Sequence, residues 1–239
     1  MAKKEILHEG ICYNISYEIL NPTRLQTIVF FHGWGSNKEI MKQAFGTSLP
    51  QYRHLYIDLP GFGASSIETV IDTRAYASII KNFLKACDVI PYALFGHSFG
   101  GKVATLLEPS KLVLLSSAGI VIEKPLKVTL KIAFFKLLKP FFPRSFYRFF
   151  ASKDVQGMNQ TMYEVLKKVV NEDFTEHFKE CGAEAFIFWG KEDRATPLRS
   201  GERMASLIPT NHFFALEGDH FFFIKKGKEI EKLLLESGF

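Results

Sequence analysis

One segment of the chain reads Tyr92-Ala-Leu-Phe-Gly-His-Ser-Phe-Gly-Gly-Lys-Val-Ala104, and it contains the pattern Gly-x-Ser-x-Gly centred on Ser98. The pattern stands directly after a short apolar run and before a helix-like segment, which favours a tight strand-to-helix turn. In such a turn the serine takes a strained backbone conformation, and Gly96 and Gly100 leave room for neighbouring backbone. We therefore predict that Ser98 is a nucleophile, raised above a sheet edge at the positive end of a helix. The alternative is a serine in an ordinary glycine-rich loop.

Short apolar runs that end at Gly, Pro, Asp or Ser recur along the chain and are typical of buried strands. They are Thr27–Phe31, Leu55–Asp58, Tyr92–Phe95, Leu112–Ser116, Ala185–Trp189 and Phe213–Leu216. Helical patterns lie between them, at Arg74–Cys87, Gly101–Leu107, Leu198–Leu207 and Lys228–Leu235. Strands that alternate with helices pair in parallel through right-handed crossovers, so we predict an α/β fold with a doubly wound sheet. Residues 11–20 would add an antiparallel hairpin at the sheet edge.

One interval interrupts this alternation of strands and helices. Residues 119–182 contain no convincing strand, only helical periodicity broken by Pro125, Pro140 and Pro143. A chain of 239 residues is long enough for one domain with a modest insertion. We therefore expect a core formed by residues 1–119 and 183–239, and a helical cap formed by residues 120–182.

A serine nucleophile needs a general base, and the base needs an acid that orients it. Asp193 is the predicted acid because it stands in a loop that follows a strand, and Glu192 is the neighbouring alternative. His220 is the predicted base because it comes just after the last predicted strand, whereas His97 is expected to point away from Ser98. The chain order Ser, Asp, His is known for such catalytic triads. Without a catalytic role, these residues would be a surface ion pair and a solvated histidine.

The segment Phe30-Phe-His-Gly-Trp-Gly-Ser36 also stands at the end of an apolar strand. Gly33 allows neighbouring backbone to approach closely, so the amide groups of Trp34 and Phe99 can face the oxygen of a reacting carbonyl. Two such donors stabilise a tetrahedral intermediate by a few kcal/mol. We therefore predict that Trp34 and Phe99 form an oxyanion hole.

These motifs resemble the α/β-hydrolase superfamily over nearly the whole chain. The resemblance is carried by His32-Gly-Trp-Gly, Asp58-Leu-Pro-Gly-Phe-Gly, Gly96-His-Ser-Phe-Gly-Gly, Trp189-Gly-Lys-Glu-Asp and His220. It implies an α/β-hydrolase fold: a mostly parallel eight-stranded sheet flanked by helices, a catalytic triad, and a helical cap after the sixth strand. Asp219 stands where relatives usually have a small residue, so it is expected either to perturb the pKa of His220 or to compete for contact with it.

The activity implied is that of a serine carboxylesterase, which cleaves a small-molecule ester through an acyl-enzyme. The first two of these motifs are similar to the pimeloyl-acyl-carrier-protein methyl ester esterases, so that ester or a similar acyl ester is the leading substrate. The loop Trp189-Gly-x-x-Asp-Arg-x-x-Pro197 is similar to the meta-cleavage-product hydrolases, which cleave a C–C bond in 2-hydroxy-6-oxo-dienoates. Those enzymes usually have Asn before the nucleophile and Trp after the catalytic His. His97 and Phe221 stand there in this chain, which favours the esterase.

A protein of another class, a non-catalytic receptor that binds a ligand on the same fold, is the remaining alternative. The complete set of Ser98, Asp193 and His220 argues against it.

Positive charge is concentrated in the predicted cap. Residues 120–150 hold seven basic residues and one acidic residue, whereas the whole chain carries a net charge of +5, so the remainder is slightly negative. Such a surface attracts an acidic partner, either an acyl carrier protein or, more weakly, an anionic membrane surface. The predicted contacts are Lys131, Lys136, Lys139 and Arg144. The plainer alternative is a helix whose apolar face covers the active site and whose charges are solvated. Nucleic acid is not expected, because no recognised binding motif accompanies the charge.

Three cysteines without a Cys-x-x-Cys spacing indicate neither a disulfide framework nor a zinc site. We therefore expect no metal and no organic cofactor, and a reduced cytoplasmic setting. The first residues lack the apolar run of a signal peptide, and no uncharged apolar stretch has the length of a membrane helix.

Overall fold

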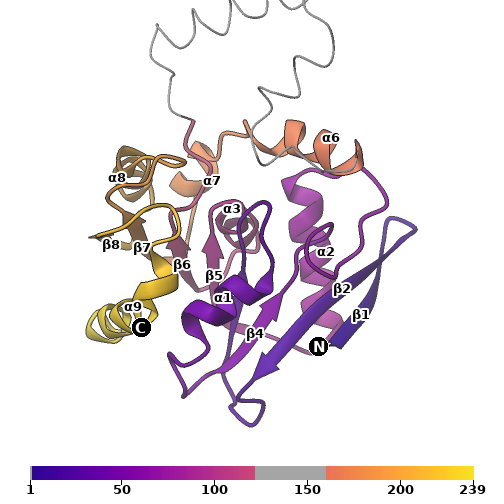
Figure 1. Ribbon diagram of the computed structural model, residues 1–239, viewed down its shortest axis with the longest axis horizontal. Helices are drawn as coiled ribbons and strands as arrows, with labels where there is room; N and C mark the ends of the chain where they lie inside the picture. Colours follow the sequence, from indigo (N-terminus) through magenta and orange to yellow (C-terminus); the bar gives the residue numbers. More distant parts are fainter. Residues whose placement is uncertain (1, 122–159) are drawn as a thin grey trace, which may run out of the picture.

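A computed structural model describes residues 2–121 and 160–239 (Figure 1). Its centre is an eight-stranded sheet with the strand order β1-β2-β4-β3-β5-β6-β7-β8. Strand β2 pairs antiparallel with both β1 and β4, and every other neighbouring pair is parallel. The predicted α/β fold with a mostly parallel sheet is therefore confirmed. An antiparallel hairpin does lie at one edge, but residues 11–20 form only its second strand, and residues 2–8 form the first.

The strands are β1 (Ala2–His8), β2 (Ile11–Leu20), β3 (Thr27–Phe31), β4 (Arg53–Ile57), β5 (Pro91–His97), β6 (Lys111–Leu115), β7 (Glu184–Gly190) and β8 (Asn211–Leu216). The described helices are α1 (Lys38–Phe45), α2 (Thr73–Ala86), α3 (Phe99–Leu106), α6 (Gln160–Val169), α7 (Thr175–Lys179), α8 (Leu198–Leu207) and α9 (Phe223–Glu236). Every predicted strand is present, with ends within two residues of those expected. Strand β1 and helix α1 were not predicted.

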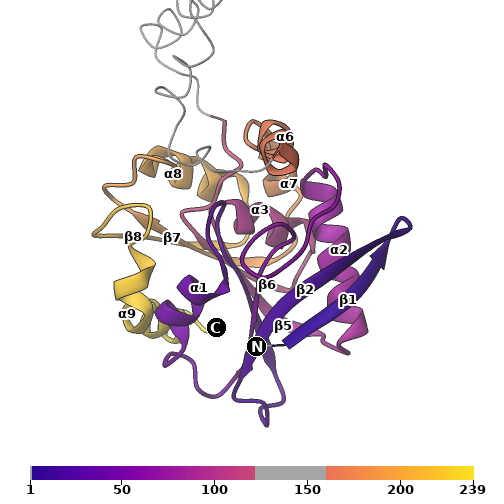
Figure 2. The same cartoon turned by 45° about the vertical axis from the view of Figure 1, so that its right-hand side comes forward.

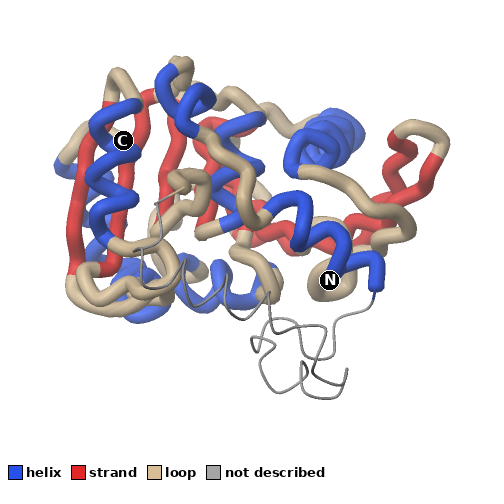
Figure 3. The backbone as a smooth tube through the Cα atoms, turned by 90° about the horizontal axis from the view of Figure 1, so that it is seen from above, coloured by secondary structure: helices blue, strands red, loops and turns tan. Residues whose placement is uncertain are grey.

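Strand β3 shows how the chain pattern builds the two apolar layers. All of its residues are buried, and their side chains alternate between the two faces of the sheet. Val29 and Phe31 join the core under α2, α3 and α8, whereas Ile28 and Phe30 join the core under α1 and α9. Helices thus cover both faces of the sheet (Figures 2 and 3).

Helices α6 and α7 belong to the part of the predicted cap that the structure describes. The chain between β6 and β7 contains them, and α6 is attached to the core by a buried cation. The ammonium group of Lys102 in α3 is 2.6 Å from the carbonyl oxygen of Val169 and 2.8 Å from a carboxylate oxygen of Glu172. That carboxylate also accepts hydrogen bonds from Thr73 at the start of α2. The division into core and cap remains a prediction, and the basic contacts Lys131, Lys136, Lys139 and Arg144 lie outside the described residues.

Within the described ranges, 2–121 and 160–239, none of the helices combines the length and the apolar character that crossing a membrane requires.

Candidate active site

The predicted site residues follow the carboxyl ends of parallel strands. Trp34 follows β3, Ser98 follows β5, Asp193 follows β7 and His220 follows β8. Because these strands run in the same direction, their carboxyl ends meet at one edge of the sheet, which is where ligands bind in open α/β sheets.

Ser98 has the strained backbone conformation that the motif predicts. Its φ is 49° and its ψ is −115°, at the N-terminus of α3. Backbone hydrogen bonds hold it there: its amide donates to Leu115 of β6 (3.1 Å), and its carbonyl accepts the amides of Gly101 and Ala118 (3.0 Å each). The side-chain hydroxyl does not cap the helix. Residues in such conformations persist only where the surrounding structure holds them, and they cluster at functional sites.

The two glycines of the turn leave the room that the motif predicts. A Cβ atom at Gly96 would lie 2.5 Å from Cα of Gly101, and one at Gly100 would lie 2.5 Å from the carbonyl oxygen of His32. Both obstacles are backbone atoms. The start of α3 therefore approaches β5 at Gly96, and the end of β3 at Gly100, only because these side chains are absent.

Gly100→Ala is therefore expected to destabilise the protein by about 3 kcal/mol, the upper end of the usual cost of overpacking. Urea unfolding followed by circular dichroism measures the loss. Gly182→Ala is the matched control, because no atom lies within 4 Å of a Cβ there, and its effect should stay within about 0.5 kcal/mol. Equal stability of both variants would contradict the close approach.

Asp193 and His220 are brought together as predicted. Oδ2 of Asp193 lies 2.7 Å from Nδ1 of His220, and Oδ1 accepts the amides of Ala195 (2.8 Å) and Thr196 (2.9 Å). Burial favours the neutral acid, but the hydrogen bond and charge of His220 and the hydrogen bonds from Thr196 and Ser116 together outweigh it, so the pKa of Asp193 lies below its ordinary value. An ionised Asp193 makes Nδ1 of His220 the donor of this bond, so in the neutral imidazole Nε2 is the nitrogen that can accept a proton.

The structure shows the contacts of Glu192 and Asp219, the two acidic residues whose roles the sequence left open. The carboxylate of Glu192 accepts the amide of Gly218. The carboxylate of Asp219 accepts the amide of Phe221 at 2.9 Å and so caps its own turn. The geometry thus favours Asp193 over Glu192, and Asp219 acts on the backbone next to His220 rather than on its ring.

Thr196 is a site residue that sequence reasoning missed. Its hydroxyl lies 2.9 Å from Oδ2 of Asp193, 3.3 Å from Nδ1 of His220 and 3.1 Å from the carbonyl oxygen of Ser116. A hydroxyl on the residue three positions after an Asp is the spacing of a local polar turn, and this signal could have identified it.

The predicted oxyanion donor Trp34 is positioned by its neighbours. Nε2 of His32 accepts the amide of Leu59 (3.0 Å), so Nδ1 carries the proton and donates to the carbonyl of Gly33 (2.8 Å). Burial lowers the pKa of His32 to about 4, which keeps the ring neutral. In a planar trans peptide the N–H of Trp34 points opposite to the carbonyl of Gly33, so His32 fixes its direction. A Cβ at Gly33 would lie 3.1 Å from Cβ of Ser98, which places this peptide beside the predicted nucleophile.

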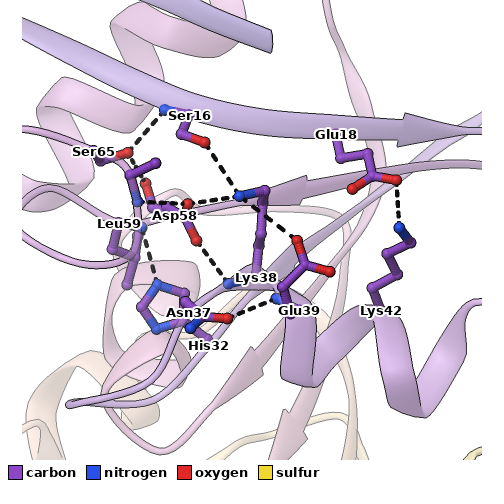
Figure 4. A network of polar contacts seen from close by, with 11 residues as sticks. Ser16, Glu18, His32, Asn37, Lys38, Glu39, Lys42, Asp58, Leu59 and Ser65 are labelled. Atoms are coloured by element: carbon purple, nitrogen blue, oxygen red, sulfur yellow. Dashed lines mark hydrogen bonds and ion pairs between the residues drawn. The ribbon is translucent and has the colours of Figure 1, made fainter. Parts of the chain in front are cut away.

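A buried ion pair supports the same loop (Figure 4). The ammonium group of Lys38 lies 2.7 Å from Oδ2 of Asp58, and the side chains are 2% and 0% exposed. Asp58 also accepts the amides of Lys38 (2.8 Å) and Ala64 (3.0 Å), and Lys38 donates to the hydroxyl of Ser16 (3.2 Å). Burial alone would raise the pKa of Asp58, but the hydrogen bonds from Lys38 and Ala64 and the charge of Lys38 together outweigh it, and the pKa is lowered. The pair joins the end of β4 to the start of α1.

The three cysteines are free, and the described residues contain no group of three or more His, Cys, Asp or Glu side chains arranged to hold a metal ion.

Comparisons with known proteins agree with the fold described above. The sequence profile of the "Alpha/beta hydrolase family" matches residues 28–231. The chain is 26% identical to "Uncharacterized hydrolase YugF" of Bacillus subtilis (strain 168), over 85% of this chain and 86% of that protein. It is 36% identical to "Pimeloyl-[acyl-carrier protein] methyl ester esterase" of Legionella pneumophila (strain Corby), over 35% of this chain and 34% of that protein. Among solved structures, an esterase from Exiguobacterium antarcticum superposes with a TM-score of 0.76 at 22% identity, covering 99% of both chains.

Proposed function

This chain belongs to the alpha/beta hydrolase family, and from that premise we propose that it is a serine carboxylesterase with Ser98 as its nucleophile, His220 as its general base and Asp193 as the acid that orients the base. The observation that carries the proposal is the 2.7 Å contact between the buried carboxylate of Asp193 and Nδ1 of His220. Ser98 supports it, because a strained residue at the start of a helix is the backbone setting of a nucleophile.

The reaction has two halves, acylation and deacylation of Ser98, and His220 acts first as a base and then as an acid in each. Ser98 Oγ attacks the ester carbonyl while Nε2 of His220 takes its proton, and the amides of Trp34 and Phe99 donate to the oxyanion. The tetrahedral intermediate collapses, His220 returns the proton to the leaving alcohol, and an acyl-enzyme remains on Ser98. Water then attacks the acyl group as His220 takes a proton from it, and Ser98 leaves with that proton when the acid is released.

The substrate we propose is an acyl ester, with the methyl ester of a pimeloyl-acyl carrier protein as the leading example. The similarity of His32-Gly-Trp-Gly and Asp58-Leu-Pro-Gly-Phe-Gly to that esterase family supports this choice, together with the Legionella pneumophila relative. The proposal includes a cap formed by residues 120–182, whose basic residues would meet the acidic carrier protein.

Ser98 should be labelled stoichiometrically by a serine-directed phosphonate, because in the proposed mechanism His220 takes the proton of its hydroxyl as it attacks. Mass spectrometry of proteolytic peptides locates the label, and prior denaturation of the protein is the control. The same preparation is assayed on short esters, on a carrier-linked methyl ester and on a dienoate C–C substrate. No label on Ser98 would indicate a non-catalytic receptor, and faster turnover of the dienoate than of the esters would overturn the ester assignment.

Replacing Lys131, Lys136, Lys139 and Arg144 with glutamine should reduce kcat/KM for the carrier-linked ester at least about 10-fold at low salt, since charge complementarity accelerates association. A short neutral ester is the control substrate and should be unaffected. The difference should shrink at high salt, because screening shortens the range of the attraction. An equal loss on both substrates would remove the carrier protein from the proposal.

A further inference from the structure

His97 occupies a place in the site that the mechanism above does not use. It is the last residue of β5, directly before Ser98, and only 1% of it is exposed. Its ring centre lies 4.7 Å from that of His220 and 4.6 Å from that of Phe223. On another side, a Cβ atom at Gly33 would lie 2.7 Å from Nδ1 of His97. The ring of His97 thus lies between the loop that contains Gly33 and Trp34 and the loop that contains His220.

One hydrogen bond defines the protonation of this ring. Nε2 of His97 lies 3.0 Å from the carbonyl oxygen of His220, and because a carbonyl only accepts, Nε2 carries the proton. Burial, together with the nearby His220, holds the pKa of His97 well below its ordinary value, so the ring is neutral and Nδ1 is unprotonated. Nδ1 is buried and has no hydrogen-bond partner among the described residues.

Burying the imidazole of His97 lowers the stability of the folded protein more than burying an apolar side chain of similar size would. A buried acceptor without a partner destabilises a folded protein, and an apolar side chain would fill the same space without that cost. The bond from Nε2 to His220 is what the imidazole adds at this position.

We propose that His97 is a positioning residue for the general base. Its Nε2–H holds the backbone carbonyl of His220, while Asp193 holds the other end of the residue through the imidazole Nδ1. Because His97 is covalently joined to Ser98, the bond links the backbone of the base to the backbone of the nucleophile across a single residue. The inference rests on the proposed function, in which His220 takes the proton of Ser98.

A matched pair of variants separates this bond from the packing of the ring. His97→Gln has an amide donor at the same number of bonds from Cβ as Nε2, and His97→Met has a similar length without a donor. We expect His97→Met to lower kcat and the rate of phosphonate labelling of Ser98 about 10- to 100-fold, as a small misplacement of a catalytic group does. KM for a short ester should remain nearly unchanged, and His97→Gln should restore most of the loss. His97→Phe, which keeps an aromatic ring beside Phe223, is the second variant without a donor.

Hydrogen exchange gives a readout that does not depend on activity. The amides of Phe221 and Phe222 are hydrogen-bonded to Asp219 in the loop of His220. Mass spectrometry should show these amides exchanging at least about 10-fold faster in His97→Met and at the native rate in His97→Gln. Unchanged exchange and unchanged kcat in both donor-free variants would overturn the proposal, as would an equal loss in the Gln and Met variants of equal thermal stability. If native protein neither hydrolyses esters nor is labelled, the proposed function fails, and exchange alone then decides whether His97 holds this loop.

Discussion

Ser98→Ala should lower kcat for ester hydrolysis by about 10⁴- to 10⁶-fold, because it removes the atom that would form the acyl-enzyme in the proposed mechanism. The substitution should leave the free energy of unfolding almost unchanged, since the hydroxyl of Ser98 neither caps α3 nor makes a hydrogen bond to a described residue. Residual hydrolysis should remain above the rate in water, because the predicted donors Trp34 and Phe99 still face the carbonyl oxygen. Stopped assays with a chromogenic short ester, at enzyme concentrations high enough to detect the residual rate, measure the change.

Ser206→Ala is a suitable control for this experiment. Its hydroxyl donates to the backbone carbonyl of Arg203 on the exposed side of α8, a helix that contributes none of the predicted catalytic residues. It should retain native activity. If Ser98→Ala kept more than a small fraction of native kcat, Ser98 would not be the nucleophile and the proposed mechanism would be wrong.

The strands and the turn at Ser98 could be predicted because their signals are local. Apolar runs closed by turn residues mark β3, β5, β6, β7 and β8, and the glycines around Ser98 mark a turn that only small residues fit. Since parallel strands end at one sheet edge, the order of strands along the chain also predicted that Asp193 would meet His220. Helix α1 was missed although Asn37 caps it with a bond to Glu39, a signal that the sequence contains.

The remaining parts of the site depend on contacts between residues that are far apart in the sequence, and no local pattern predicts those contacts. A lysine at the start of a helix is ordinarily solvated, so nothing local shows that Lys38 is buried against Asp58, which is 20 positions away along the chain. The bond from His97 to the carbonyl of His220 spans 123 positions and involves a backbone atom, which has no sequence signature. Thr196 is intermediate, because its spacing from Asp193 is local but its contact with His220 is not.

Asp58→Asn and Lys38→Met should each destabilise the protein by about 3–5 kcal/mol at pH 7, because each leaves one buried charge without its partner. The double variant removes both charges and should recover about 1–3 kcal/mol of the summed loss. Full recovery is not expected, because the carboxylate of Asp58 also accepts the amide of Ala64, which an asparagine NH₂ group in that place does not replace. The native protein and the three variants form a double-mutant cycle, and urea unfolding measures the free energy of unfolding of each. Lys232→Met, which removes one partner of an exposed ion pair in α9, is the control.

The pH dependence of the same cycle has a definite sign. The pKa of Asp58 is lower in the folded protein than its ordinary value, so its stabilising contribution is complete above the unfolded pKa of about 3.9 and is lost as the pH falls through the folded pKa. The difference in stability between native protein and Asp58→Asn should therefore be largest near pH 7 and shrink in acid. Because the pair of Lys38 and Asp58 anchors the start of α1 next to the loop of His32 and Trp34, each single variant should also change activity. It should lower kcat by a larger factor than it changes KM. A stability difference that is small at pH 7, or that grows as the pH falls, would show that the charge on Asp58 does not hold this loop.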